Sequence, residues 1–530
     1  MSNRAPVFVR EATGLVREIS WFSVFVYGMT VMGFQFTFYY IASLAPLVGG
    51  NIGFGFLVMG LTMLSVILVY HAFTVIMPRS GGDYVFVGRN LHPLIGFVGN
   101  LSYGVTLLLY AAINGVTIET TGLSQTFAYF GALYNNPTLS SLASTVSTPV
   151  SIAILGLVWI IAGALVVLGP VRLYLKVQNL MFVIVLIGAL AMIVALVSMS
   201  QPSFISSFNG FASQYMGKSG DYYQSVINSA AADGWMPPET SSLYGGLLFY
   251  PIVAVGGFYG IYGAQISGEI RNPKKSYLLG SLLGAGVYLG LTGITLLLLY
   301  NAMGFNFLSA IDYLLYNKPS QIPLPALPYA NLLISIAANP VFGVVIFLAG
   351  IIQLFMFICS AYLFMSRGLF AYSFDRLISD WFTKVSDRTH GPLNSIIAST
   401  IITLILFVVV NIPASATYVY LFSSVATWWQ AIFPGFFVGL VALVVCVRRP
   451  QLYKALPIKG WKLAGLGLST MFFTLLQTYL LLTNSVYGAN TPIGIELVAG
   501  AVVVFIIIYL YAWLTRGPSL RLAFKEIPPE

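Results

Sequence analysis

Long apolar segments recur along the whole chain, and they constrain its fold more than any other feature. A helix of roughly 20 apolar residues is long enough to cross the hydrocarbon core of a bilayer. Of the 530 residues, 58% are hydrophobic and only 7% are charged, whereas soluble proteins carry about 25% charged residues. The sequence therefore predicts an all-α integral membrane protein.

Twelve of these segments are long enough to span a bilayer, so we predict twelve transmembrane helices. The tenth is unusually long and contains Pro434, which predicts a kink in that helix. No change in composition marks a soluble domain, so residues 1–530 are predicted to form a single membrane transport domain. The predicted spans are 20–42, 54–77, 94–119, 150–168, 178–199, 243–267, 277–303, 341–366, 393–411, 416–447, 463–483 and 492–514.

The basic residues predict how the chain is oriented in the membrane. With twelve spans both termini lie on one side, and all but two of the 24 lysines and arginines fall on that side. The exceptions are Lys218 and Lys318. Basic residues are enriched in cytoplasmic loops, so we predict a multi-pass protein of the cell membrane with N- and C-termini in the cytoplasm. Topology and anionic lipid headgroups then explain the net charge of +9 better than nucleic-acid binding does.

The sequence lacks the signatures of most enzymes. The three histidines, His71, His92 and His390, lie in unrelated segments without the spacing of a metal site. No segment matches the glycine-rich loop that binds ATP phosphates. Both cysteines, Cys359 and Cys446, lie inside apolar runs and predict no disulfide framework. We therefore expect neither an enzyme nor a cofactor, and no metal beyond a possible sodium ion.

Two spans contain glycine clusters that a simple membrane helix avoids. In the first span Gly28 and Gly33 flank four residues, and in the sixth glycines occur at 256, 257 and 260. Glycine in a helix interior costs about 1 kcal/mol relative to alanine. Backbone groups freed by a break must face a cavity or a ligand inside a membrane, and paired interrupted helices mark the substrate site of secondary transporters. We therefore predict breaks in spans one and six.

Close helix packing is the alternative explanation for such glycines. It is the preferred interpretation for Gly280 and Gly284 in the seventh span, which are spaced like a helix-packing motif. Polar side chains within spans have a structural interpretation as well. Asn114, Tyr110 and Gln265 are expected to form hydrogen bonds between helices rather than to bind substrate.

Four segments together resemble the amino acid–polyamine–organocation (APC) transporters. The segment after the second span reads MPRSGGDY from Met77 to Tyr84, which is similar to that family's signature at this position. The segment after the sixth span, GEIRNPKK from Gly268 to Lys275, contains the family's E-x-x-N-P motif. The run RGLFAYSFDR from Arg367 to Arg376 resembles the loop after the eighth span, and Arg17 to Ser20 fits the start of the first.

The resemblance implies a LeuT-like fold, a five-plus-five inverted repeat in which helices 1 and 6 are broken. The first repeat is expected over residues 20–199 and the second over 243–447, followed by two additional C-terminal spans over 463–514. In such a fold the substrate lies between spans one and six, surrounded by spans three, eight and ten.

The resemblance also implies which residues bind the substrate. Backbone amides at Thr30 to Gly33 would hold a carboxylate, and carbonyls at residues 256–258 would accept hydrogen bonds from an amine. Free N–H groups at a helix start attract anions for the same reason. Tyr103 aligns with a gating aromatic of the family. The predicted substrate-binding residues are Gly28, Met29, Thr30, Val31, Met32, Gly33, Tyr103, Gly256, Gly257, Phe258, Tyr259 and Gly260.

Na+ and H+ are both candidate coupling ions, and exchange without an ion is a third option. The fifth span lacks the lysine that some family members carry. Glu269 is the acid nearest a span core, although an ion pair is the preferred interpretation because Arg271 lies beside it. The resemblance implies a sodium site between spans one and eight, near Tyr27, Cys359 and Ser360, where Ser360 could equally be a packing residue. We expect sodium to be favoured, as in a symporter.

The predicted function is secondary active transport of an amino acid by alternating access. A neutral substrate is expected because no acid lies mid-membrane to pair with a cationic side chain. The aromatic faces of Phe258, Tyr259 and Tyr262 could hold a cation instead, so a polyamine or cationic amino acid transporter or exchanger is the alternative. A channel is disfavoured because the sequence shows no repeated ring of selectivity residues.

Overall fold

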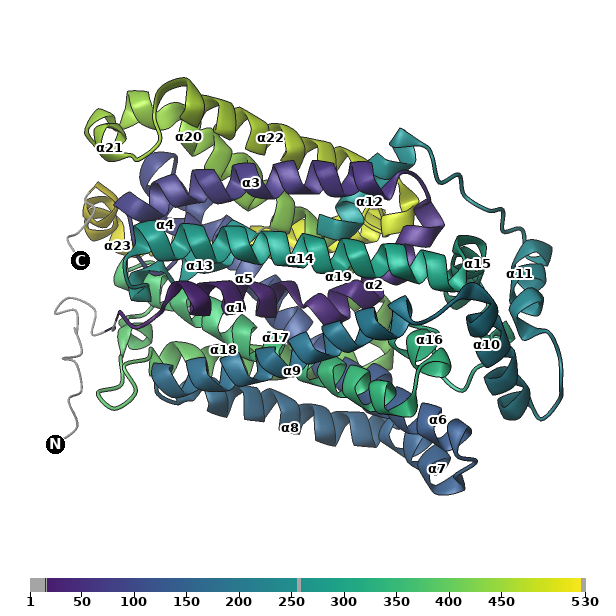
Figure 1. Ribbon diagram of the computed structural model, residues 1–530. Coiled ribbons are helices and arrows are strands. Elements are labelled where there is room, and N and C mark those ends of the chain that lie inside the picture. The colour runs from purple at the N-terminus through teal and green to yellow at the C-terminus, as the bar shows by residue number, and fades with distance from the viewer. Residues whose placement is uncertain (1–14, 16, 255–258, 526–530) are drawn as a thin grey trace, which may run out of the picture.

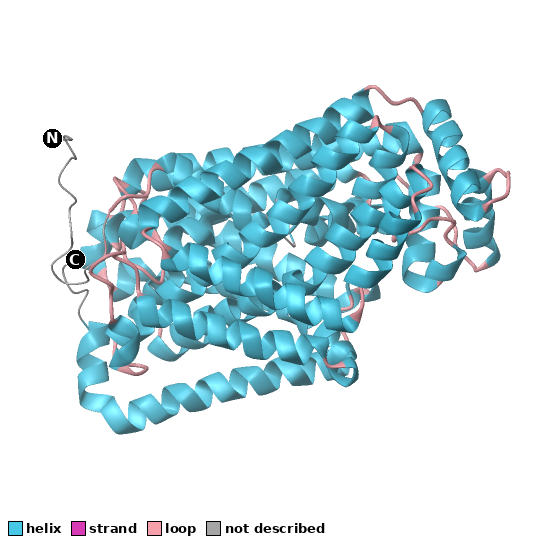
Figure 2. Ribbon diagram, turned by 90° about the horizontal axis from the view of Figure 1, so that it is seen from below, coloured by secondary structure: helices cyan, strands magenta, loops and turns pink. Residues whose placement is uncertain are grey.

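The protein is a bundle of helices whose long axes run side by side (Figures 1 and 2). The computed structural model describes residue 15 and residues 17–254 and 259–525. The start of α1 and the end of α23 lie at one end of the bundle, which we call the terminal end. The opposite end carries several short helices and is called the loop end. Across the described ranges, sheet-like pairing is confined to one parallel bridge between Ile19 and Ile270.

Nine helices within the described residues are long and apolar enough to cross a membrane. Their outer faces carry large exposed apolar side chains such as Val150, Leu165 and Leu180, which water would disfavour and lipid accepts. These helices indicate a multi-pass membrane protein. The nine spans are α3 (Ile52–Ile76), α5 (Pro93–Thr117) continuing through η1 (Ile118–Leu123) into α6 (Ser124–Leu133), α8 (Pro149–Leu168), α9 (Val171–Val197), α14 (Pro273–Met303), α17 (Pro340–Phe374), α18 (Leu393–Asn411), α22 (Gly460–Thr483) and α23 (Pro492–Lys525).

Each of the other three predicted spans contains two or more shorter helices. The first consists of α1 (Trp21–Met32) and α2 (Phe34–Val48), and the sixth of α12 (Leu243–Ala254) and α13 (Tyr259–Gln265). The tenth consists of α19 (Ala416–Ala431), the π-helix η6 (Ile432–Phe437) and α20 (Val438–Arg448). The π-helix contains Pro434, whose missing N–H disrupts the regular α-helical ladder. Over its described residues each predicted span is therefore mostly helical, and the total of twelve crossings stays a prediction.

Close packing explains the glycine of the seventh span. A Cβ atom on Gly280 would lie 2.6 Å from the carbonyl oxygen of Trp21 and 2.8 Å from the Cβ of Val24. Both are closer than real Cβ contacts allow, so only glycine lets α14 lie directly against α1. The packing interpretation of Gly280 is confirmed.

Short helices cover the two ends of the bundle. At the loop end, α15 rather than α16 contributes described side chains to the central cavity. The loop-end elements are α7 (Pro137–Val146), α10 (Gln201–Met216), α11 (Tyr222–Ala232), α15 (Phe305–Asn317), η3 (Pro319–Gln321), α16 (Ala330–Ala337), η5 (Pro413–Ser415) and η7 (Ser485–Tyr487). Those at the terminal end are α4 (Asp83–Asn90), η2 (Ser267–Glu269), η4 (Asp380–Thr383) and α21 (Pro450–Ala455).

Candidate functional site

The first span is interrupted at Gly33. This residue has φ 64° and ψ 58°, a left-handed conformation that ends α1 and precedes α2. Glycine adopts it at little cost because it has no Cβ. The amide of Gly33 is already used, since it donates to the carbonyl of Met29 at 3.1 Å. The first N–H groups of α2, which starts at Phe34, have no acceptor within their own helix.

The sixth span is divided between two helices that flank the predicted second break. Helix α12 ends at Ala254 and α13 begins at Tyr259. Gly256, Gly257 and Phe258 lie outside the described residues, as does the side chain of Tyr259. Gly260 is buried in α13, and its carbonyl accepts a hydrogen bond from the Tyr277 hydroxyl at 2.8 Å. That carbonyl therefore already has a protein partner.

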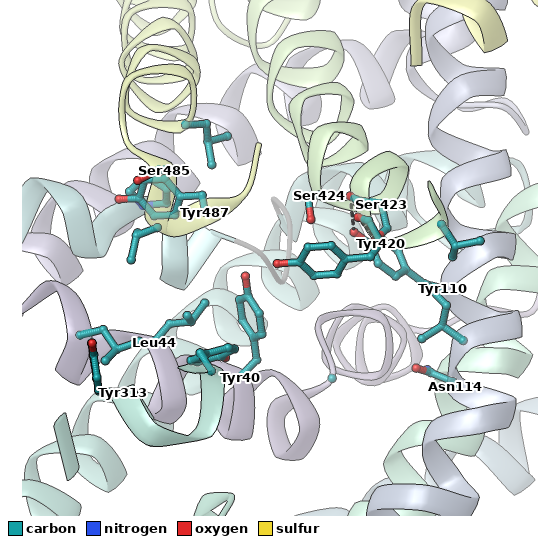
Figure 3. A pocket seen from close by; sticks show the side chains of 18 of the residues that line it. Tyr40, Leu44, Tyr110, Asn114, Tyr313, Tyr420, Ser423, Ser424, Ser485 and Tyr487 are labelled. Carbon is teal, nitrogen blue, oxygen red and sulfur yellow. Dashed lines mark hydrogen bonds between the residues drawn. The ribbon is translucent and has the colours of Figure 1, made fainter. Parts of the chain in front are cut away.

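A cavity of about 1100 Å³ reaches the break in the first span. Val31 and Gly33 line it beside the break, together with Tyr262 of α13 and Gln353 of α17. It extends to loop-end residues, among them Trp235. Further walls come from α2, α5, α15 and α19, whose lining residues include Tyr40, Leu44, Leu107, Tyr110, Asn114, Tyr313, Tyr316, Tyr420, Ser423 and Ser424. Figure 3 shows Tyr40 and Tyr420 pointing into the same space, with Tyr110 and Asn114 on one side.

The cavity is aromatic and hydroxyl-rich, and no charged side chain of a described residue lines it. Some of its polar groups also connect helices. Tyr110 donates to the carbonyl of Ser423 at 3.1 Å, and the Asn114 amide donates to the carbonyl of Leu354 at 3.4 Å. Both residues thus form the expected hydrogen bonds between helices, and both also line the cavity. Such a surface is mostly apolar, with a few polar groups that can orient a ligand.

Aromatic side chains close the cavity on the side of the terminal end. Tyr103 donates a hydrogen bond of 2.8 Å to the hydroxyl of Tyr262, and both rings are buried. Tyr27 packs edge-on against Tyr262 with ring centroids 6.4 Å apart, and Phe364 packs against Tyr103 at 5.1 Å. This four-ring cluster lies on the terminal-end side of the cavity. Tyr27 and Tyr103 precede the first lining residues of α1 and α5, which start at the terminal end, and Phe364 follows the last lining residue of α17, which ends there.

The structure brings only part of the predicted substrate-binding set to the cavity. Val31 and Gly33 line it, while Tyr103 lies one layer below through its bond to Tyr262. Gly28, Met29 and Thr30 are buried within α1, and the side chain of Met32 is not among those described. Spans eight and ten were expected around the substrate, but none of their lining residues was named, so Gln353 of α17 and the lining residues of α19 were not predicted. These segments carry no motif that shows which helix face meets α1.

The expected sodium-site residues lie close together between α1 and α17. The Tyr27 hydroxyl donates to the backbone carbonyl of Ser360 at 3.4 Å, and Cys359 is buried beside it. The carbonyl of Thr30, another expected ligand, accepts a hydrogen bond from the Gln353 amide at 3.0 Å. Within the described residues, no group of three or more His, Cys, Asp or Glu side chains could hold a metal ion.

Glu269 forms an ion pair, but with a different arginine from the one expected. Both of its carboxylate oxygens accept hydrogen bonds from Arg367, at 2.8 Å and 3.0 Å, and both side chains are buried. Arg271, the neighbour in sequence, instead donates to the carbonyl of Arg17. The two partners, in η2 and α17, are 98 residues apart in the sequence. The spacing of residues within either segment therefore does not reveal this pair.

A second buried ion pair lies nearby at the terminal end. Arg89 of α4 contacts both oxygens of Asp375, at 2.6 Å and 2.7 Å, and Tyr84 donates to the same carboxylate at 2.6 Å. The guanidinium of Arg89 also lies over the ring of Phe524, 4.4 Å from its centroid. These contacts join α4, the end of α17 and the end of α23.

A chain of hydrogen bonds connects the Arg89–Asp375 pair, through Tyr84, to the sixth span. Asp83 accepts from Asn100, Tyr70 and the amide of Tyr84. Asn100 also donates to Gln265 and accepts from Tyr372. Burial raises the pKa of Asp83 to about 7, against the opposing effect of its hydrogen bonds from Asn100 and Tyr70. Gln265 thus has the interhelical role expected from its sequence position.

Comparison with known proteins identifies the family. A search of curated proteins finds no similar sequence. The family model described as "Amino acid permease" matches residues 19–513, nearly the whole chain. That range includes the interrupted first span, the cavity walls and both buried ion pairs, and it agrees with the resemblance of the four sequence motifs. The chain therefore belongs to the amino acid permease family of the APC superfamily.

Proposed function

We propose that this amino acid transporter carries a neutral substrate by alternating access. The observation that supports this proposal best is the cavity of about 1100 Å³ next to Gly33. Its described lining offers tyrosine rings and hydroxyl groups but no carboxylate that could pair with a cationic side chain. An unpaired charge inside a membrane protein is costly, so a neutral side chain suits this cavity.

The helix ends beside the cavity can bind the charged backbone of an amino acid. Free N–H groups in the first turn of α2, together with the positive end of that helix dipole, favour a carboxylate near residues 34–36. This position is one turn beyond the amides at 30–33 that the family resemblance implies. The C-terminal carbonyls of α12, whose Pro251 lines the cavity, favour the ammonium group. The substrate site therefore includes Gly33, Tyr262 and the predicted residues 256–260.

The proposed orientation places the terminal end in the cytoplasm. The buried pairs Glu269–Arg367 and Arg89–Asp375 then form the cytoplasmic seal, and the cavity belongs to an outward-facing state. Residues 20–199 and 243–447 would be the two inverted repeats, each beginning with a divided helix, in a LeuT-like arrangement with twelve spans. The distribution of basic residues supports this orientation.

Sodium is the coupling ion that we propose. The supporting observation is that Tyr27 and Ser360 meet between α1 and α17, where oxygen atoms are available without any carboxylate. Glu269 is held by two hydrogen bonds from Arg367, which favours a structural role over proton transfer.

Transport into proteoliposomes tests both substrate and ion. We expect counterflow of a radiolabelled neutral amino acid that other neutral amino acids inhibit and that arginine and putrescine do not. A sodium gradient should drive accumulation, while a pH gradient in sodium-free buffer should not. Inhibition by arginine or putrescine alone would instead support the cationic alternative, since tyrosine rings bind cations. Proton-driven uptake that is lost in Glu269→Gln would overturn sodium coupling.

A matched pair of tyrosine variants tests whether the described cavity is the transport site. Tyr262→Phe removes the acceptor of the Tyr103 hydrogen bond, which is worth about 1 kcal/mol, so the apparent KM should rise roughly fivefold. Tyr418→Phe changes an exposed tyrosine outside the cavity and should leave the KM unchanged. Equal effects of the two variants would place the substrate elsewhere.

A further inference from the structure

Asp312 is a buried carboxyl group without the partners that buried acids normally have. It lies in α15 at the loop end and is 2% exposed. Its Oδ2 atom has no hydrogen-bond partner in the described part of the chain, and no ion pair to it is found there. Burying an ionised carboxylate without a partner costs so much that the group normally becomes neutral. Its protonation state therefore needs an explanation.

The surroundings of Asp312 supply phenols rather than cations. Its ionisable neighbours are Tyr300 on α14, Tyr316 on α15 and Tyr329 before α16. The hydroxyl of Tyr300 is also buried without a hydrogen-bond partner. Helices α2 and α11, which pack against α15, contain no acidic or basic residue, and neither does η3.

The charged residues at the ends of these elements make contacts with groups other than Asp312. Lys318, which follows α15, pairs with Asp233 after α11 at 3.7 Å, and both are partly exposed. Asp221 caps the start of α11 by accepting from the amide of Gln224. Nothing in this inventory neutralises Asp312. Burial accordingly raises the pKa of Asp312 well above its ordinary value.

Helix α15 forms part of the cavity wall through Ser309, Tyr313 and Tyr316. Asp312 itself is not among the lining residues, but it lies three residues after Ser309 and four before Tyr316, at the edge of the face that lines the cavity. Trp235 donates to the Ser309 hydroxyl at 3.0 Å, and Tyr316 lies 3.1 Å from the hydroxyl of Ser43 on α2. The packing that buries Asp312 is thus the packing that positions this wall.

From this geometry we propose that Asp312 is a proton-binding site, and that its bound proton holds α15 packed against α2 and α14 along the cavity. The ligand is a single proton on the carboxyl group. When the proton leaves, the carboxylate gains by reaching water, so α15 detaches from its neighbours. Asp312 is not among the residues proposed to bind substrate or sodium, and this inference does not depend on those proposals.

The direction of the pH effect follows from linkage. The packed state binds the proton more tightly than the detached state, in which the carboxyl has an ordinary pKa of about 4. Packing is therefore most favoured below that pH, and it weakens as the pH rises toward the pKa of the buried group. At pH values between the pKa of the detached carboxyl and the pKa of the buried carboxyl, the equilibrium constant for detachment of α15 rises by up to about tenfold per pH unit.

Hydrogen exchange of the full-length protein in lipid nanodiscs tests this proposal. Protection of residues 305–317 is measured from about pH 6 to about pH 9, corrected for the intrinsic pH dependence of amide exchange, with residues 330–337 of α16 as the internal reference. In the wild-type protein, protection of α15 should fall with pH relative to α16. Asp312→Asn, which is neutral at every pH, should keep its protection throughout, and Asp233→Asn should behave as wild type.

Three results would overturn the proposal. One is a wild-type protection of α15 that does not change with pH, a measurement that requires no variant to fold. Another is that protection of α15 falls with rising pH as much in Asp312→Asn as in the wild type, which would assign the pH dependence to a different group. The third is restoration of protection at high pH by sodium chloride but not by N-methylglucamine chloride, which would make the occupant a sodium ion.

Discussion

The terminal end and the loop-end half of this bundle consist of the same kind of helices, but one is tightly closed and the other contains a cavity. The terminal end buries two ion pairs, Glu269–Arg367 and Arg89–Asp375, and the second is joined to a chain of side-chain hydrogen bonds. The loop-end half contains a cavity of about 1100 Å³ whose described lining is uncharged. One end is closed by directional contacts between segments far apart in sequence, and the other keeps space for a ligand.

This difference shows how such a protein can change state. Removing one partner of a buried ion pair costs much more than the intact pair contributes to stability, so each pair is either fully formed or fully separated. The apolar and aromatic contacts around the cavity are less directional and tolerate rearrangement. We infer that opening the terminal end requires the separation and hydration of both ion pairs together.

The largest expected effect concerns which end faces the outside. In a Cys446→Ser background, single cysteines at Lys218 and Lys318, both exposed at the loop end, should react completely with an impermeant maleimide added to intact cells. Cysteines at Lys274 and Lys454, exposed at the terminal end, should react only after the membrane is permeabilised. Cys359 is buried and serves as the unreactive background. The opposite labelling pattern would reverse the roles of the two ends.

The next largest effect concerns the closed end. Arg367→Met should lower the free energy of unfolding by roughly 3–5 kcal/mol, because Glu269 is left buried without its partner. The double variant Glu269→Gln with Arg367→Met should recover much of that loss, since no unpaired charge remains. Thermal unfolding in detergent measures both.

A surface pair provides the control for this experiment. Arg172 pairs with Glu18 at 2.7 Å, but half of its side chain is exposed, so Arg172→Met should change stability by less than about 1 kcal/mol. If Arg367→Met and Arg172→Met were equally mild, the buried pair would not be what closes the terminal end.

The smallest effect concerns the break beside the cavity. Gly33→Ala places a Cβ on a residue with φ 64°, which should cost about 1–2 kcal/mol and weaken substrate binding in a thermal-shift titration. Gly286→Ala is the matched control, because a Cβ there meets nothing within 4 Å on the exposed face of α14. It should be neutral or stabilise by about 0.4–1 kcal/mol. Unchanged binding in Gly33→Ala would separate the break from the substrate site.

Much of the fold could be predicted from local sequence patterns. Apolar segments of membrane length predicted the long helices of the bundle but not the short helices at its two ends, and Pro434 predicted the irregular tenth span. Gly28 and Gly33 predicted an interruption in the first span, and the structure places it at Gly33, whose left-handed conformation glycine adopts at little cost. Gly280 could be interpreted as a packing residue from its spacing alone. Each of these features depends on properties of a single helix, such as its length, its period or one residue's conformational range.

The candidate site could be predicted only in part, since it depends on which helix faces meet. Val31 and Gly33 were expected at the cavity, whereas Tyr262 entered the sequence analysis only as a possible cation-binding ring and Gln353 not at all. Arg271 was the expected partner of Glu269 because it is near in sequence, but the structure places Arg367 there. Neither segment of a long-range ion pair contains a local pattern that identifies its partner.

The amino-acid sequence alone therefore determined the membrane location of the helices, the family motifs and the break at Gly33, because these follow from solvent transfer and local backbone energetics. Tertiary structure decided which polar groups are buried together. It paired Glu269 with Arg367, placed Tyr103 under Tyr262 and buried Asp312 without a partner. The physical reason is that the energy of a buried polar group depends on its neighbours in space, and those neighbours come from helices that are far apart along the chain.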